Sequence, residues 1–324
     1  MNNSTKLYEN LMREAMNGRN KLTTETLIKV RNLYEEVAND LLKKAETAKG
    51  GFTKAWTYDY EKYIRYKILE LNNQLSQLTE EAVKTSAEIA ASVQGDFLSY
   101  INSKYHLDID KEKLEVAYST NSDLIGQIIQ GGFYKDSRSL SERIWTYGNK
   151  YNNDIQYIIT KSMAEQKSYL ETIKDLEKFL KSNTDSDFKK SYTKLYNRRV
   201  DFNAQRLLRT SVNHMFFASS INKAQKNPYI YAVHWNLSST HNERQVKHFG
   251  EDECDQYATV DEYGLGIGNF PKYKVPIPHP QCLCYHTMEI SKSLDEIGEE
   301  LGQWVRGGSN PTLDNWLDVL SKVL

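Results

Sequence analysis

The first two thirds of the sequence lack proline, and their last part also lacks glycine. None of the six prolines precedes Pro228, and no glycine lies between Gly148 and Gly250. Because proline breaks helix interiors and glycine weakens them, residues 1–227 are free to form long helices. Four of the six prolines fall within residues 271–280, so the chain beyond about residue 228 is expected to be built differently.

Long apolar runs, excess charge and paired cysteines are missing too. No stretch of about 18 apolar residues is present, which argues against a membrane span. The first ten residues lack the basic and apolar regions of a secretory signal peptide. With 42 basic and 43 acidic residues, net charge indicates no partner. Three cysteines in 324 residues are no disulfide framework, so we expect an intracellular, reducing place of synthesis.

Apolar residues at three- and four-residue spacing predict long helices in the N-terminal region. Thr23 and Thr24 are candidate caps of a helix that stops at Gly50-Gly51. Residues 53–105 fit one long helix that only Gly95 weakens. The apolar share of 39% is low for a compact globule, so we expect an elongated region with a modest core.

The same spacing continues after Gly131-Gly132. Ser139 opens a helical stretch to about residue 180, and a last long helix covers roughly residues 187–226. Beyond the prolines, the C-terminal residues fit two short helices that Gly307-Gly308 separate.

Basic residues are concentrated in the last long helix. Residues 189–226 contain nine Lys or Arg and a single acidic residue, Asp201. Such a surface could bind DNA phosphates by counterion release. A solvated helix face, or one paired with acidic surface in an assembly, explains the same bias. DNA binding is therefore a secondary hypothesis, with these candidate residues: Arg198, Arg199, Arg206 and Arg209.

The soft metal ligands are gathered in one short part of the chain. All three cysteines and five of the seven histidines lie between His234 and His286. Thiolate and imidazole groups suit zinc, and a loop-rich segment of about 60 residues could need a metal to become ordered. We therefore predict a structural zinc ion, with ligands among Cys254, Cys282, Cys284, His279 and His241.

Other interpretations of the cysteines stay open. The thiols could be reduced and buried as small apolar side chains beside hydrogen-bonded histidines. A Cys282–Cys284 disulfide would be strained. Acidic neighbours would raise the pKa of a nucleophilic thiol at Cys254. Four protein ligands would also close the coordination position that catalytic zinc needs.

Two further motifs have weaker meaning. Gly264-x-Gly-x-Gly268 follows no clear strand and precedes no helix, so we expect a flexible loop and no phosphate site. The acidic run at residues 251–255 lacks the calcium-loop pattern, and we expect it to form a turn or a helix cap.

The order of these features is similar to that of a known family. The chain resembles the phage head morphogenesis proteins, the minor head proteins similar to protein F of phage Mu. Leu283 stands where family members usually carry an arginine. The resemblance covers residues 139–285. It rests on motifs in a fixed order along the chain: Arg209-Thr210 in a long helix, a strand at Tyr229–Trp235, His241, Cys254-Asp255, the glycine-rich loop and the closing stretch Pro278–Cys284.

The resemblance implies a structural virion component and no enzymatic activity. Such a protein would be made in the host cytoplasm and join the phage head through the portal protein. Its further partners would be capsid or scaffolding proteins and double-stranded DNA. It would act in head assembly, DNA packaging or DNA ejection.

The alternative function is a metal-dependent nuclease, or a DNA-binding protein acting through residues 189–226. The nuclease would use His241, Asn242 and His279 around a catalytic metal beside the basic helix. Against it, the sequence offers no paired carboxylates and no identifiable open metal site.

The expected fold is mainly α, with an elongated helical N-terminal region and a small α+β, zinc-stapled C-terminal module. Four consecutive ranges are expected. Residues 1–132 form the helical N-terminal region, and residues 133–228 the helical part of the head morphogenesis domain. Residues 229–290 form the β/loop module with the Cys/His cluster, and residues 291–324 a helical tail.

Overall fold

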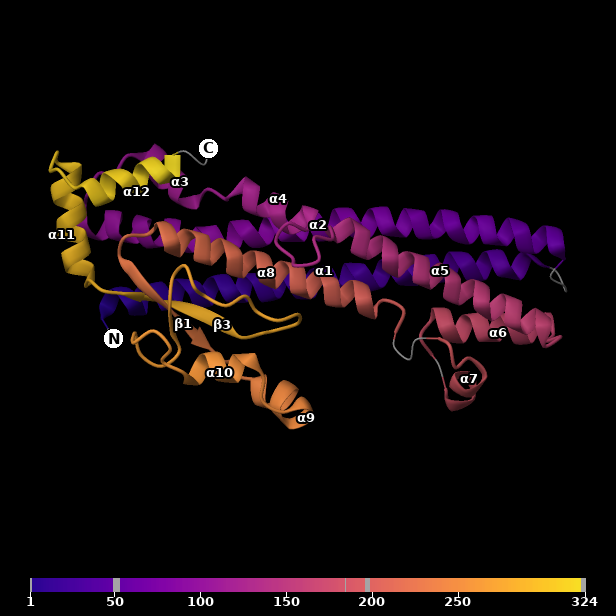
Figure 1. Ribbon diagram of the computed structural model, residues 1–324. Helices are drawn as coiled ribbons and strands as arrows, with labels where there is room; N and C mark the ends of the chain where they lie inside the picture. Colours follow the sequence, from indigo (N-terminus) through magenta and orange to yellow (C-terminus); the bar gives the residue numbers. More distant parts are fainter. Residues whose placement is uncertain (1, 49–52, 184, 196–198, 322–324) are drawn as a thin grey trace. The chain divides into compact units, whose positions relative to one another are not determined.

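Figure 1 shows the computed structural model of the chain, which describes residues 2–48, 53–183, 185–195 and 199–321. The predicted mainly helical fold is confirmed, and a small sheet lies in the last third of the chain. Among the described residues, no helix is apolar over a length that would cross a membrane. The helices before the sheet are α1 (Asn3–Ala45), the 3-10 turn η1 (Glu46–Ala48), α2 (Lys54–Tyr105), α3 (Lys111–Tyr118), α4 (Ser122–Gln130), α5 (Leu140–Ala164), α6 (Tyr169–Leu180), α7 (Ser186–Ser191) and α8 (Phe202–Lys226).

The last third of the chain combines strands with short helices. Its strands form a three-stranded antiparallel sheet in the order β2-β1-β3, with Val233 opposite both Phe270 and Met288. The elements are β1 (Ile230–Asn236), the π-helical turn η2 (Asn242–Val246), α9 (Lys247–Phe249), α10 (Glu253–Thr259), β2 (Asn269–Pro271), β3 (Tyr285–Ile290), α11 (Leu294–Val305) and α12 (Pro311–Ser321).

One predicted helix start is wrong. Helix α1 begins at Asn3 and passes through Thr23 and Thr24, because buried residues at helical spacing continue back to Tyr8 and Met12. The predicted stop at Gly50-Gly51 lies outside the described residues.

The predicted helix over residues 187–226 is two helices, α7 and α8. Residues 192–195 and 199–201 lie outside both helices. The buried Asp201 accepts from the Arg199 side chain at 3.1 Å, and its backbone oxygen accepts the Gln205 N–H at 3.0 Å. A carboxylate at this position favours a helix start, which explains why α8 begins here.

The helical stretch predicted from Ser139 to about residue 180 is two helices, α5 and α6, with residues 165–168 between them. Helix α2 covers the predicted range, and Ser139 caps α5 in a capping box with Glu142. Gly95 does not break α2. A Cβ there would lie 2.4 Å from the Tyr118 ring of α3, so the glycine allows this ring to pack against α2.

The chain divides into two compact units that do not follow the four predicted ranges. Unit 1 contains Met1–Leu22, Val83–Ile128 and Thr210–Leu324. Unit 2 contains Thr23–Ala82 and Ile129–Arg209. Each unit is therefore assembled from segments that are distant along the chain, and α1, α2 and α8 each contribute residues to both.

Aromatic side chains from three helices meet in the core of unit 2. The ring centroids of Tyr34 and Tyr151 are 5.6 Å apart, and those of Tyr151 and Phe179 are 5.9 Å apart. These rings come from α1, α5 and α6, whose packing they connect.

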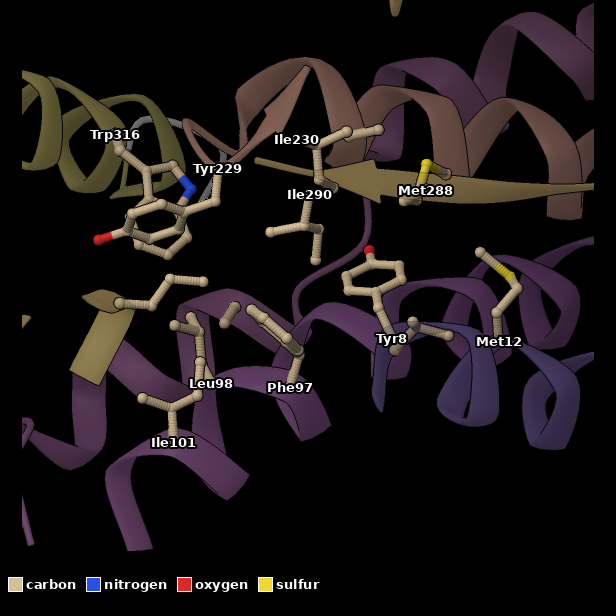
Figure 2. Close-up of a cluster of buried hydrophobic side chains, with 14 of the residues drawn as sticks. Tyr8, Met12, Phe97, Leu98, Ile101, Tyr229, Ile230, Met288, Ile290 and Trp316 are labelled. Atoms are coloured by element: carbon tan, nitrogen blue, oxygen red, sulfur yellow. The ribbon is translucent and has the colours of Figure 1, made fainter. Parts of the chain in front are cut away.

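The core of unit 1 lies between one face of the sheet and the helices around it. Figure 2 shows Tyr8 and Met12 of α1 and Phe97 of α2 near Met288 and Ile290 of β3. At the other end of this cluster, Trp316 of α12 meets Tyr229 with ring centroids 6.2 Å apart. Both ends of the chain thus contribute to one apolar core.

The first turn of α1 is hydrogen-bonded to the end of β3. Asn2 donates to the Ile290 carbonyl at 2.8 Å, and the Ile290 N–H donates to the Thr5 hydroxyl at 3.2 Å. The Asn3 side chain accepts the Leu294 N–H at 2.8 Å, at the start of α11. These bonds satisfy backbone groups where the sheet would otherwise end in an open edge.

One lysine in unit 1 is buried, and its ammonium is hydrogen-bonded to a backbone carbonyl. Lys223 of α8 is 6% exposed, and its ammonium donates to the Ala117 carbonyl at 3.0 Å. Burial, with the nearby Lys226 charge, lowers the pKa of Lys223 to about 8. The ammonium therefore costs stability at neutral pH.

Lys223→Met is expected to stabilise the protein at pH 7. The unfolded lysine titrates at 10.5, so the unfolded chain binds more protons between pH 8 and 10.5 and wild-type stability rises through that window. A shift of this size corresponds to about 3 kcal/mol, and the lost hydrogen bond costs about 1 kcal/mol. Urea unfolding should show a gain of about 2 kcal/mol at pH 7 that vanishes at pH 10.5. The exposed Lys6→Met is the control, and a variant less stable than wild type at pH 7 would contradict the prediction.

Candidate metal centre

One face of α8 holds the loop that carries two of the three cysteines. The Thr210 hydroxyl accepts the Gln281 N–H at 3.3 Å, and the Asn213 amide donates to the Cys282 carbonyl at 3.1 Å. His214 Nε2 donates to the Pro278 carbonyl at 2.9 Å. Positions 210, 213 and 214 have the spacing of a single helix face, so α8 fixes residues 278–282 along that face.

The loop itself is a tight turn. The Cys282 N–H donates to the His279 carbonyl at 3.1 Å, and Gln281 adopts a positive φ of 66°. The Cys284 N–H then donates to Cys282 Sγ at 3.3 Å. This bond brings the Cys284 backbone against the Cys282 sulfur.

The third cysteine is placed by the N-terminal cap of α10. Asp252 is the cap, and its carboxylate accepts the Cys254 N–H at 2.8 Å. Asp255 completes a capping box by accepting the Asp252 N–H at 2.8 Å. The expectation that the acidic run forms a turn or cap is confirmed.

The three sulfur atoms meet in one buried place. The Sγ atoms of Cys254 and Cys282 are 3.5 Å apart, and all three Sγ atoms lie within 4.8 Å of one another. The cysteines are 1–3% exposed and share an apolar cluster with Phe217 and Trp235. This group could hold a metal ion, and the nearby histidines and aspartates offer further ligand atoms.

The thiols influence one another's protonation strongly. Hydrogen bonds from the Cys254 and Cys282 thiols lower the pKa of Cys284 to about 2. Hydrogen bonds to Cys282 and to Cys284 raise the pKa of Cys254, with burial adding to the effect. For Cys282, the bond from Cys254 acts downward, but the bond to Cys284 and burial raise the pKa to about 12. The hydrogen bonds within the cluster therefore favour ionisation of Cys284 over that of the other two cysteines.

His241 lies next to this cluster and is 7% exposed. Its Nδ1 atom is 3.5 Å from Cys284 Sγ, and its Nε2 atom is 3.0 Å from the Asp255 carboxylate. Burial acts to lower the pKa of His241, but Asp255 and the Cys284 thiolate outweigh it and raise the pKa. The imidazole thus connects the sulfur cluster to the capping box of α10.

His279 has different partners. Its Nε2 atom is 3.1 Å from Asp252 Oδ2, and its Nδ1 atom is 3.0 Å from the Pro280 carbonyl. Asp252, Cys254 and His279 also have ligand atoms within 4.8 Å of one another. Of the five predicted ligands, the structure brings the three thiols together, with His241 against Cys284 and His279 against Asp252.

A buried arginine extends this network to the N-terminal helix. Arg19 of α1 is 4% exposed and donates to the Asn213 side-chain oxygen at 2.7 Å. Asn213 in turn donates to the Cys282 carbonyl. Burial lowers the pKa of Arg19 to about 10, and the Cys282 sulfur opposes that shift. Sequence reasoning missed Arg19, Asn213 and His214, whose only signal is polar residues on otherwise apolar helix faces.

A pocket of about 210 Å3 opens beside the cluster. Its walls are formed by His241, Arg244 and Phe249 on one side and by residues 279–283 on the other. Two of the residues proposed for a nuclease therefore line it, whereas Asn242 does not. The described residues that line the pocket include no carboxylate.

The glycine-rich loop is ordered by backbone hydrogen bonds. Gly264, Gly266 and Gly268 all have positive φ angles, and the Trp235 N–H donates to the Gly268 carbonyl at 2.8 Å. The loop leads into strand β2. A phosphate loop would lead into a helix.

The predicted DNA-binding residues lie near the start of α8. Arg198 lies outside the described residues, and Arg199 pairs with Asp201. Arg206 is exposed and Arg209 is half-buried. Residues 211–217 are all buried, so DNA binding stays a prediction for the first turns of α8 only.

Asn213→Ala is expected to destabilise the protein by about 2–4 kcal/mol, because two buried groups each lose a hydrogen-bond partner. The affected groups are the Arg19 guanidinium and the Cys282 carbonyl. Chemical unfolding followed by circular dichroism measures the change. The exposed Asn153→Ala on α5 is the control, and equal stability of the two variants would show that the Asn213 bonds contribute nothing.

Comparisons with known proteins add no relative to this description. No protein-family model matches the chain, and neither a curated protein nor a solved structure matches it.

Proposed function

We propose that this chain is a minor component of a phage head, a structural and interaction protein that associates with the portal. It would act in head assembly, DNA packaging or DNA ejection, in the host cytoplasm during assembly and afterwards in the virion. In this chain, a structural zinc ion would stabilise the fold of the C-terminal module. The proposal combines the sequence resemblance with the chemistry of the buried thiol cluster.

The observation that supports the proposal most is the clustering of the residues on which the resemblance rests. Trp235, Cys254, Cys282 and Cys284 come from three separate segments and form one buried group. Thr210 of α8 binds the loop between them. A motif whose members pack together is a structural unit, which supports a structural role for these residues.

Zinc suits the cluster better than other common ions. Three thiolates and imidazole nitrogen are ligands that zinc prefers, whereas calcium and magnesium take oxygen. The two nearby aspartates are engaged in the capping box of α10. Zinc bound to three thiolates and a histidine keeps no open position for a substrate, which argues against the nuclease alternative.

The protein is expected to bind one zinc ion per chain. The ion would bind the folded chain and not the unfolded one, so it would add to the free energy of unfolding. At a free zinc concentration 1,000-fold above the dissociation constant the gain is about 4 kcal/mol, and a chelator should remove it. Elemental analysis of protein purified without added metal gives the stoichiometry, and thermal unfolding with and without a chelator gives the stability. A zinc-free protein with unchanged thermal stability would rule out the structural ion.

The chain is also expected to bind procapsids through the portal. Procapsids assembled with portal protein should retain the chain during sedimentation, and procapsids assembled without portal should not. The matched control is the surface variant Lys6→Met, which should behave as wild type. Equal retention with and without portal would contradict the portal association, and no retention on either would contradict the head-protein function.

A further inference from the structure

We propose that the zinc ion is bound by Cys254, Cys282, Cys284 and the Nδ1 atom of His241, with Asp255 as the residue that positions His241. His279 stays outside the coordination shell. The inference rests on the proposed zinc ion and assigns its ligands.

The distances already approach those of a zinc site. A tetrahedral ion with Zn–S of about 2.3 Å and Zn–N of about 2.0–2.1 Å places sulfur atoms about 3.8 Å apart and sulfur and nitrogen about 3.5 Å apart. The Cys254–Cys282 Sγ distance is 3.5 Å, and the distance from Cys284 Sγ to His241 Nδ1 is 3.5 Å. Two of the six distances between the proposed ligand atoms are thus already close to those of a tetrahedral site.

Asp255 sets the orientation and tautomer of His241. An ionised carboxylate only accepts hydrogen bonds, so the Nε2 atom of His241, 3.0 Å away, carries the hydrogen. The Nδ1 lone pair then faces Cys284. A carboxylate behind a histidine is the usual arrangement around protein-bound zinc, because it fixes the ring and makes the ligating nitrogen more basic.

His279 has a ligand atom within 4.8 Å of Cys254 Sγ, but its ring nitrogens are engaged elsewhere. Both its ring nitrogens face oxygen atoms, of Asp252 and of the Pro280 carbonyl. The side chain is 29% exposed, whereas that of His241 is 7% exposed. To bind the ion, His279 would have to leave Asp252, whose carboxylate also holds the Cys254 N–H.

The charge of the assigned site fits its surroundings. Zinc with three thiolates and one neutral imidazole carries a net charge of −1, which is costly to bury alone. Arg19 is buried in the same unit and is connected to Cys282 through Asn213. Its guanidinium supplies positive charge that interacts with Cys282.

Cobalt substitution distinguishes the two histidines. Co2+ alone, added to the metal-free full-length chain, reports thiolate and nitrogen ligands through its charge-transfer and d–d absorption bands. His241→Cys should still bind Co2+, with stronger charge-transfer absorption and d–d bands at longer wavelength, because a fourth thiolate replaces nitrogen. His279→Ala should reproduce the wild-type spectrum. His241→Ala should weaken Co2+ binding by at least about tenfold.

Asp255→Asn tests the positioning role, because asparagine keeps an oxygen that can cap α10. It should lower Co2+ affinity by about 10- to 100-fold while leaving the thermal stability of the metal-free protein unchanged. A merely structural role would lower that stability as well.

Opposite results separate the hypotheses. A changed spectrum in His279→Ala, with an unchanged one in His241→Cys, would overturn the ligand assignment and leave the zinc ion in place. Wild-type protein that binds no Co2+ or Zn2+ would overturn both. Neither result bears on the portal association, which the sedimentation experiment tests by itself.

Discussion

Three thiols share one buried place, and this constraint organises the C-terminal module. As thiolates they would repel one another in a poorly solvated site, and as thiols they have few good hydrogen-bond partners. Hydrogen bonds from the other two thiols favour ionisation of Cys284, but they raise the pKa of Cys254 at the same time. A divalent cation removes this conflict, since it attracts all three sulfurs and replaces protons on the thiols.

The elements around the cluster share the task of holding the sulfurs together. Helix α8 fixes the loop before Cys282, and the cap of α10 fixes Cys254. The sheet contributes Trp235 to the apolar wall. Helix α1 reaches the same region through Arg19, and Asn2, just before α1, donates a hydrogen bond to the end of β3. A module that looks local in the sequence therefore depends on helices from the far end of the chain.

Sequence reasoning succeeded where the determining interactions are local. The range of α2 and the cap of α5 follow from periodicity and from a capping box within four residues. The convergence of the three cysteines followed from residue type and spacing. The contacts of Asn2 with Ile290, across 288 positions, leave no periodic signal. The break before α8 was missed because neither proline nor glycine marks it, and a buried Asp201 starts the helix instead.

The histidines show why neighbours in sequence are a poor guide to metal ligands. His279 precedes Cys282 by three residues, which made it the natural fourth ligand beside the two cysteines of its loop. The tight turn that joins them uses the His279 carbonyl, and the ring turns toward Asp252. His241 is 43 positions from Cys284, yet its Nδ1 atom faces that sulfur because Asp255 binds the opposite side of the ring. A ligand needs a directed lone pair, and the carboxylate behind the ring decides that direction more than separation along the chain does.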